Sequence, residues 1–190
     1  YYFPQSVMNG AFTPTLEYVD MFPLADGTPF DWDNPDHMNK IFSDRDPRLF
    51  ETVLVNNAPY QGRQVELWIG GREAQQGPRT EQGQFATGFG LFKFILHLND
   101  ARNRPTLWPY LRMAEIHLTY AEALMMAGRT DDAIDEIDAV RARVGLQGLR
   151  ESNPSKDYSD RAVLLEAILN ERACELGLED VRFFDLIRHK

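Results

Sequence analysis

Paired carboxylates are the one arrangement in this sequence that acid–base chemistry could use. Glu115 with Glu122, and Glu171 with Glu175, can each be placed on one face of a predicted helix. A glycosidase needs two carboxyl groups that face each other across a cleft. Arg172 stands three positions before Glu175, and opposite charges at such spacing usually form ion pairs on a helix surface or in a structural network. We therefore predict no catalytic residue.

Metal-binding and nucleophile motifs are also absent. None of the four histidines has a ligand spacing such as H-E-x-x-H. The acidic loop 31–36 departs from the EF-hand pattern, with Pro35 at the fifth position and Phe42 where the closing glutamate belongs. A helix-capping role for this loop is favoured over a loose calcium site. Because G-x-S-x-G and a phosphate loop are missing as well, we predict neither metal nor cofactor.

Aromatic residues among turn residues are the remaining candidates for function. Each is more often a core residue than a ligand contact, but flat rings on a preformed loop suit stacking against sugar rings. Tyr60 has the best loop context, and Trp68 can occupy either face of a predicted strand. We select three candidate ligand-binding residues: Trp32, Tyr60 and Trp68.

Composition limits the class of protein. The chain has 190 residues and a net charge of −9, which argues against a nucleic-acid binder. The single cysteine, Cys174, excludes an internal disulfide and is expected to be buried. No stretch resembles a membrane span. Since the chain begins at Tyr1 and ends within a charged helix, we interpret it as a fragment.

Two regions differ in composition, with a boundary near Pro109. Residues 1–109 hold ten of the eleven prolines and nine of the thirteen glycines, which predicts a loop-rich region. We expect a short helix with Leu16, Val19 and Met21 or Phe22 facing inward. We also expect strands at 48–55, 64–69 and 91–96, and a surface loop at 70–90.

Residues 110–190 are predicted to be helical. Apolar residues recur at helical spacing over 110–127 (Tyr110, Met113, Ala114, Tyr120, Ala121 and Leu124) and over 131–144. Gly128 separates the two helices, and Thr130 is the predicted N-cap of the second. Further helices are expected at 160–176, capped by Ser159, and from about 180 to the end. Residues 110–144 resemble one tetratricopeptide repeat, with Ala121, Gly128 and Ala133 at its small-residue positions; its neighbours must be other helices.

Five segments, in order, resemble the C-terminal portion of the SusD/RagB family. They are PTLEYVDMF (14–22), DRDPRL (44–49), WPYLRMAEIHLTYAEALMMAG (108–128), VRARVGL (140–146) and ILNERACELGLEDVRFFDLIR (168–188). Any one segment is weak, whereas five in family order are specific. Asp180 departs from the family pattern, which has glycine there.

This resemblance implies a mostly α, SusD-like fold with a tetratricopeptide-type helix pair and a loop-rich part with a few short strands. It implies a lipoprotein at the extracellular face of the outer membrane, anchored through a part outside this sequence, with a SusC-like TonB-dependent transporter as partner. The charged residues of the three C-terminal segments are called the hallmark charges, and they include Arg112, Glu122, Arg172 and Glu175. We interpret them as structural scaffold residues and not as ligand contacts.

Our hypothesis is therefore a non-enzymatic oligosaccharide-binding subunit of a SusC/SusD-type nutrient uptake complex. Two alternatives stay open. The helix pair 110–144 is typical of a peptide or protein interaction module, and the paired glutamates leave a carbohydrate-active hydrolase as a third class.

Overall fold

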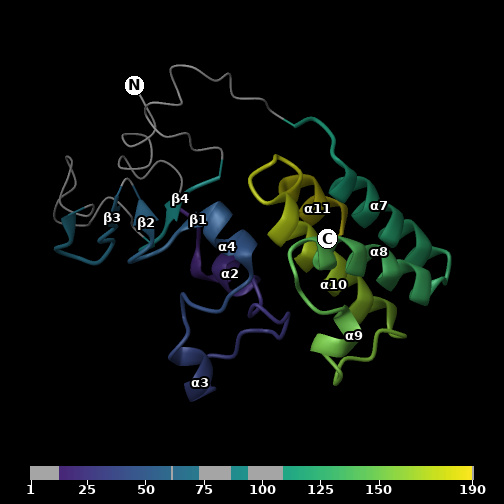
Figure 1. Cartoon of the computed structure of the whole chain (residues 1–190). Coiled ribbons are helices and arrows are strands. Elements are labelled where there is room, and N and C mark those ends of the chain that lie inside the picture. The colour runs from purple at the N-terminus through teal and green to yellow at the C-terminus, as the bar shows by residue number, and fades with distance from the viewer. Residues whose placement is uncertain (1–12, 61, 73–86, 94–108, 190) are drawn as a thin grey trace. The chain divides into compact units, whose positions relative to one another are not determined.

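A computed structural model describes residues 13–60, 62–72, 87–93 and 109–189 (Figure 1). The fold is mostly α with a few two-residue strands, which confirms the predicted fold class. Its N-terminal elements are α2 (Leu16–Asp20), α3 (Pro35–Met38), α4 (Pro47–Thr52), β1 (Val53–Leu54), β2 (Pro59–Tyr60), β3 (Arg63–Gln64) and β4 (Gly90–Leu91). The C-terminal helices are α7 (Met113–Met126), α8 (Thr130–Arg143), α9 (Leu149–Ser152), α10 (Arg161–Leu176) and α11 (Arg182–Arg188).

The contacts divide the chain into two compact units. The first comprises residues 1–19 and 49–108, and the second comprises residues 20–48 and 109–190. The second unit therefore adds the segment 20–48 to the C-terminal helices. Each unit is described by itself below.

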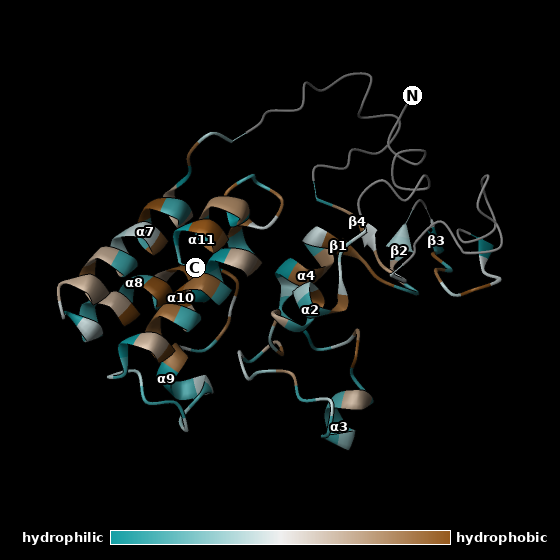
Figure 2. Ribbon diagram, turned by 180° about the vertical axis from the view of Figure 1, so that it is seen from behind, coloured by the Kyte–Doolittle hydropathy of each residue, from teal (hydrophilic) through white to brown (hydrophobic). Residues whose placement is uncertain are grey.

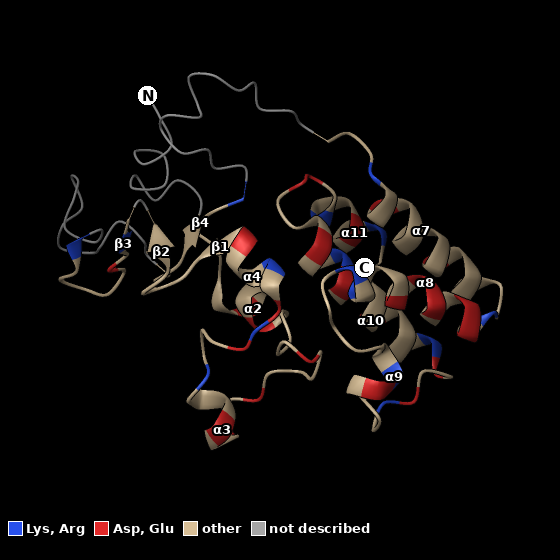
Figure 3. Ribbon diagram, in the orientation of Figure 1, with Lys and Arg blue, Asp and Glu red and all other residues tan. Residues whose placement is uncertain are grey.

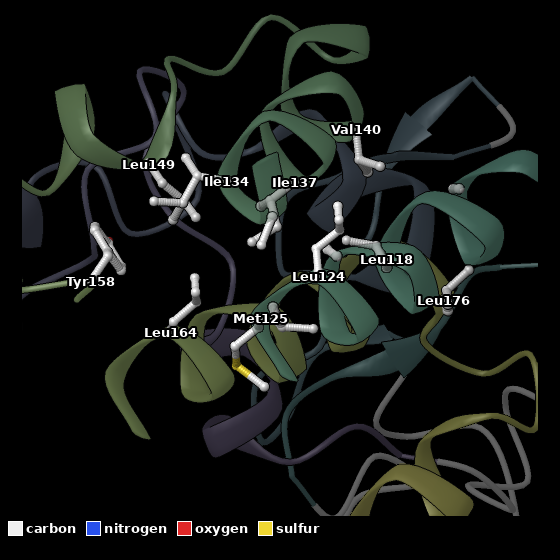
Figure 4. Close-up of a cluster of buried hydrophobic side chains, with 14 residues drawn as sticks. Leu118, Leu124, Met125, Ile134, Ile137, Val140, Leu149, Tyr158, Leu164 and Leu176 are labelled. Atoms are coloured by element: carbon white, nitrogen blue, oxygen red, sulfur yellow. The ribbon is translucent and has the colours of Figure 1, made fainter. Parts of the chain in front are cut away.

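The core of the second unit lies between α7, α8 and α10. Leu118, Ile137 and Ile168 are fully buried there, together with the small residues Ala121 and Ala133. Figure 4 shows side chains from these helices, with Leu149 and Tyr158, gathered into one cluster, and Figure 2 shows hydrophilic as well as hydrophobic residues along each helix. The two small residues predicted for the tetratricopeptide-like pair are therefore both buried in the core that α7 and α8 share.

The helix ends explain why this pair folds back on itself. Gly128 has φ 76°, a conformation that favours glycine, and the Arg129 amide donates to the Leu124 carbonyl at 2.9 Å. Asp131 and Asp132 occupy the first turn of α8, near its positive end. Thr130 is the first helical residue and not the N-cap, so that prediction was wrong. Ser159 was also wrong as a cap: Asp160 caps α10, and its Oδ1 accepts the Ala162 amide at 2.8 Å.

The apolar residues of α7 were assigned to the wrong face in part. Met113 and Tyr120 are exposed, as is Tyr110 before the helix begins, whereas Ala114, Leu118 and Met125 are buried. Helix α7 carries apolar residues on two faces, and their spacing alone does not tell which face is covered. In the same way Leu16 is exposed, although Val19 and Phe22 are buried as predicted.

A buried network of arginines and carboxylates joins the segment 20–48 to the helices of the second unit. Arg48 contacts Asp46 and Glu171 at 2.6 Å and Glu175 at 3.0 Å, and all four side chains are at most 7% exposed. Arg112 also binds Glu175, and Arg172 pairs with Asp185 at 2.8 Å. Figure 3 shows basic and acidic residues along α10 and α11. The interpretation of the hallmark charges as scaffold agrees with these contacts.

The first unit contains two small antiparallel ladders. β1 pairs with β4 and β2 pairs with β3, and Leu54, Val65 and Leu67 form a small apolar cluster beside them. The strand predicted at 64–69 is wrong after Gln64, because Val65 to Trp68 have no strand conformation. The predicted strand 91–96 is seen only at Leu91, with Phe92 and Lys93 outside it and 94–96 outside the described residues; most of the predicted loop 70–90 also lies outside them.

The predicted strand 48–55 is wrong over most of its length, since α4 covers it as far as Thr52. Pro47 stands at the first helical position, and the Asp46 carboxylate accepts the Arg48 amide at 2.9 Å. An aspartate N-cap followed by proline is a strong helix start. This signal outweighs the alternating pattern that favoured a strand.

Candidate functional site

Trp32 lies on a loop whose backbone is fixed by local hydrogen bonds. The Asp33 amide donates to Asp31 Oδ1 at 2.9 Å, and the Asp31 amide donates to His37 Nδ1 at 3.0 Å. Asn34 then caps α3 by accepting the Asp36 amide at 3.0 Å. These bonds confirm the predicted helix-capping role of the loop. They leave the Trp32 side chain 40% exposed on a defined turn.

An aromatic and an arginine support the Trp32 ring. Phe30 meets Trp32 edge-to-face with ring centroids 5.0 Å apart, a favoured aromatic geometry. The Arg45 guanidinium lies 4.2 Å from the Phe30 ring centre, within cation–π range. Arg45 is itself buried and donates to the Phe22 carbonyl at 2.7 Å and the Ile41 carbonyl at 3.1 Å. The Trp32 ring thus belongs to an ordered stack.

Phe30 and Arg45 are the supporting residues that the sequence reasoning missed. Arg45 falls within the segment DRDPRL, so a signal was present in the motif. Its role depends on contacts with residues more than twenty positions away, such as Phe22. Neither composition nor spacing reports such contacts.

Tyr60 and Trp68 both belong to the first unit, whereas Trp32 belongs to the second. Tyr60 is half-buried at the turn end of the β2–β3 hairpin, with its ring edge-to-face against Phe92 at 6.1 Å. Trp68 is 47% exposed where the chain leaves the hairpin, in a turn closed by the Gly71 amide on the Trp68 carbonyl. Tyr60 therefore belongs to the hairpin itself, whereas Trp68 lies in the chain that follows it.

Three of the four paired glutamates, Glu122, Glu171 and Glu175, are held in ion pairs. Burial alone would raise the pKa of Glu175, but hydrogen bonds from Arg112 and Arg48 outweigh it and lower that pKa to about 2. Glu171 is also buried and bound by Arg48 and Arg141. Glu122 accepts hydrogen bonds from Nη1 and Nη2 of Arg188, each at 2.8 Å. A carboxylate held in an ion pair with such a low pKa is a poor proton donor near neutral pH.

The other titratable candidates have structural surroundings. Cys174 is buried, and burial raises the pKa of its thiol well above the ordinary value, so it is not an activated nucleophile. His117 is half-buried and pairs with Glu136 at 2.5 Å. In the part of the chain that the structure describes, no three His, Cys, Asp or Glu side chains form a group able to hold a metal ion.

Residues 3–190 match the sequence model of the SusD family. This chain belongs to the SusD family. The match spans the aromatic loop, the buried charge network and the helix pair of this SusD-family chain, so these features are parts of one family fold. A comparison with curated protein sequences finds no match.

Solved structures support the same assignment. A SusD-like protein from Bacteroides fragilis is 28% identical with a TM-score of 0.69, and a SusD-like carbohydrate binding protein from the same species is 28% identical with a TM-score of 0.72. Both matches cover 93% of this chain, and they cover 36% and 35% of the respective structures. A SusD superfamily protein from Bacteroides vulgatus, 20% identical over 93% of this chain and 33% of its own, shares the fold with a TM-score of 0.56. The chain thus spans about a third of the length of these structures.

Among the described residues of this SusD-family chain, no helix combines the length and apolar character needed to cross a membrane.

Proposed function

We propose that this SusD-family chain is part of a non-catalytic, cell-surface oligosaccharide-binding subunit of a SusC/SusD-type outer-membrane nutrient uptake complex. Family membership and the likeness to a SusD-like carbohydrate binding protein support this function. The observation that carries the proposal is the Trp32 ring, which is partly exposed on an ordered loop. Because the ring is fixed before a ligand arrives, stacking on a sugar requires little further ordering.

The residues next to Trp32 in the sequence also suit a sugar ligand. Asp31 and Asp33 are exposed on either side of it in the sequence, and carboxylates accept hydrogen bonds from sugar hydroxyl groups. Flat apolar stacking combined with nearby acceptors matches the amphipathic faces of a pyranose. In the first unit, Trp68 is more exposed than Tyr60, so we propose it as a separate contact there and expect a smaller contribution from Tyr60.

A binding screen on the intact protein tests this function. A glycan array identifies the ligand class, calorimetry gives its Kd, and a reducing-sugar assay on the same glycan measures release. We expect binding without release. The Trp32→Ala substitution should weaken binding several-fold or more, because stacking contributes about 1 kcal/mol beyond the effect of buried area. The Trp32→Phe substitution should retain part of the affinity.

The matched control variant is Met38→Ala, an equally exposed apolar residue on α3 that lies outside the stack. It should leave the affinity unchanged. If no glycan binds, or if Trp32→Ala, Tyr60→Ala and Trp68→Ala all bind as tightly as the wild type, this assignment is wrong. Release of reducing sugar that disappears on replacement of one glutamate would favour the hydrolase class.

The partner and location follow from the same proposal. The partner is a SusC-like TonB-dependent transporter, and the protein is a lipoprotein on the extracellular face of the outer membrane. Affinity purification of the intact protein from outer membranes should recover the transporter. Labelling of intact cells by a membrane-impermeant reagent tests the location. A protein that stays unlabelled and copurifies with no transporter would contradict both statements.

A peptide-binding role for the helix pair is the second candidate. Met113, Ile116 and Tyr120 are exposed at helical spacing on α7, and an exposed apolar stripe is a common recognition surface. A peptide array distinguishes the two functions. Binding that is lost in Ile116→Lys and retained in Trp32→Ala would favour the peptide module.

A further inference from the structure

The short helix α11 turns its charged side inward and its apolar side outward. Asp185 is buried and accepts a hydrogen bond from Arg172 at 2.8 Å. Arg188 binds Glu122 of the neighbouring helix α7. These ion pairs fix the rotation of α11 about its own axis. As a result, large apolar side chains of this helix are each at least 54% exposed: Phe183, Phe184, Leu186 and Ile187.

Helix α7 also carries apolar side chains on the side that faces away from the core. Met113, Ile116 and Tyr120 are each at least 45% exposed, whereas Leu118 and Met125 are buried in the core. The ion pair between α11 and α7 makes the two helices neighbours (Figure 1). We call the exposed apolar residues of both helices the α7–α11 face. Since soluble proteins rarely leave large apolar patches in solvent, such a face indicates an interaction surface.

The spacing of these side chains indicates what kind of element covers them. Met113, Ile116 and Tyr120 lie at positions i, i+3 and i+7 of α7, and Phe183, Leu186 and Ile187 lie at positions i, i+3 and i+4 of α11. Side chains at such spacings form the ridges against which a second helix packs. The pair α7–α8 also resembles one tetratricopeptide repeat, which buries its faces by stacking on neighbouring repeats. The expected cover is therefore helical.

The length of the matched structures indicates where such helices come from. This chain covers only 36% and 35% of the two Bacteroides fragilis structures that it matches. Most of a protein of that length therefore lies outside residues 1–190. The charge of the chain argues against a membrane as the cover, because its net charge is −9 and anionic lipids attract basic surfaces. Helices of the same polypeptide are the occupant that these observations favour.

We propose that helices from the part of the polypeptide outside residues 1–190 pack on the α7–α11 face in the intact protein. The face is then an internal interface of one folded chain. Packing of this kind does not depend on the glycan-binding function proposed above. It closes the exposed side of α7 to a peptide, so it also bears on the second candidate function.

Oxidation of methionines in the intact wild-type protein tests this cover without any substitution. Met113 belongs to the α7–α11 face, and Met38 on α3 is an exposed methionine outside it. Hydrogen peroxide converts accessible methionine to its sulfoxide. We expect folding of the intact protein to slow oxidation of Met113 at least about tenfold, because oxidation then requires local opening. Met38, the matched control, should react nearly as fast as in the urea-unfolded protein.

Photo-crosslinking identifies the element that covers the face. In the intact protein, p-benzoylphenylalanine replaces Phe183, and irradiation of the purified monomer links this side chain to its neighbour. We expect a product of monomer mass whose second peptide maps outside residues 1–190. The same probe in place of Leu186 provides a second position if the first variant does not fold. The probe in place of Met38 is the control and should not give this product.

Other results would each overturn the proposal. A product of twice the monomer mass would assign the face to a second copy, and a crosslink formed only with the SusC-like transporter would assign it to that partner. Crosslinks within residues 1–190 would assign the face to a segment of this sequence. Oxidation of Met113 at nearly its unfolded rate would show that the face is open, as the peptide-binding role requires. Glycan binding is tested separately by the screen described above.

Discussion

Two regions of the second unit use polar groups in opposite ways. In the helical region, charged side chains are buried and bind one another, as in the contacts of Arg48 with Asp46, Glu171 and Glu175. In the loop 30–45, polar groups bind the backbone and leave an aromatic ring partly in solvent. We infer from this difference that fold stability depends on the first region and that the proposed ligand binding depends on the second. Variants that affect one property without the other test this separation.

The largest effect is expected at Arg48. Replacing it with alanine leaves three buried carboxylates without one of their partners, and removing one member of a buried ion pair typically costs about 3–5 kcal/mol. Urea unfolding of Arg48→Ala should show that loss of stability. Arg48→Lys should lose less, since it keeps the charge without the planar fork.

The matched control is Arg150, whose contact with Asp131 is as short, 2.6 Å, but whose side chain is 56% exposed. Exposed pairs contribute about 0–1 kcal/mol, so Arg150→Ala should unfold almost as the wild type does. Equal losses in the two variants would show that burial is not what makes the network important.

Acid should weaken the helical region through Glu175. Burial opposes ionisation of this carboxyl, but Arg112 and Arg48 lower its pKa from about 4.5 to about 2. A lowered pKa in the folded state means that the stabilisation is present above about pH 4.5 and is lost as the pH falls toward 2. The full contribution is on the order of 3 kcal/mol.

Unfolding free energies at pH 7, 4 and 3 measure this dependence. The wild type should lose more stability on acidification than Glu175→Gln, which has no carboxyl to protonate at that position. Glu166→Gln, an exposed site on the same helix, should keep the wild-type slope. If Glu175→Gln loses as much unfolding free energy between pH 7 and pH 3 as the wild type does, this carboxylate does not have the proposed role.

The helical region was predictable from sequence because its determinants are local and repeated. The spacing of Ala133, Ile137 and Val140 indicates a buried stripe, and Gly128 ends the preceding helix. The motif charges also indicated a structural network. Their partners were not predictable, because Arg48 binds Glu171 across 123 positions of sequence.

The candidate site was predictable only as a list of aromatics. Trp32 stood out because it lies among turn residues, but its support by Phe30 and Arg45 depends on tertiary contacts. Tyr60 shows the limit of this reasoning. Its loop context favoured an exposed ring, but the residue is half-buried and its ring packs against Phe92. Sequence reasoning also missed a pocket between the segment 20–29 and α10, because Asp20 and Ala167 line the same cavity only in the folded unit.

The smallest effects concern two helix caps of the same chemistry. Asn34 accepts the Asp36 amide at 3.0 Å at the start of the short, exposed α3, and Asp160 accepts the Ala162 amide at 2.8 Å at the start of the core helix α10. Loss of an N-cap costs about 1 kcal/mol where the helix folds with the whole unit. Asp160→Ala should therefore lower global stability by about that amount and leave the Kd for the glycan unchanged.

Asn34→Ala should behave in the opposite way. Helix α3 has no buried residue, so its loosening should change the unfolding free energy little, while the Trp32 loop that precedes it becomes less ordered. Since ordering the loop must then accompany binding, the Kd should rise about two-fold by calorimetry. If both variants lower stability equally and neither changes the Kd, stability and binding do not depend on separate regions of the second unit.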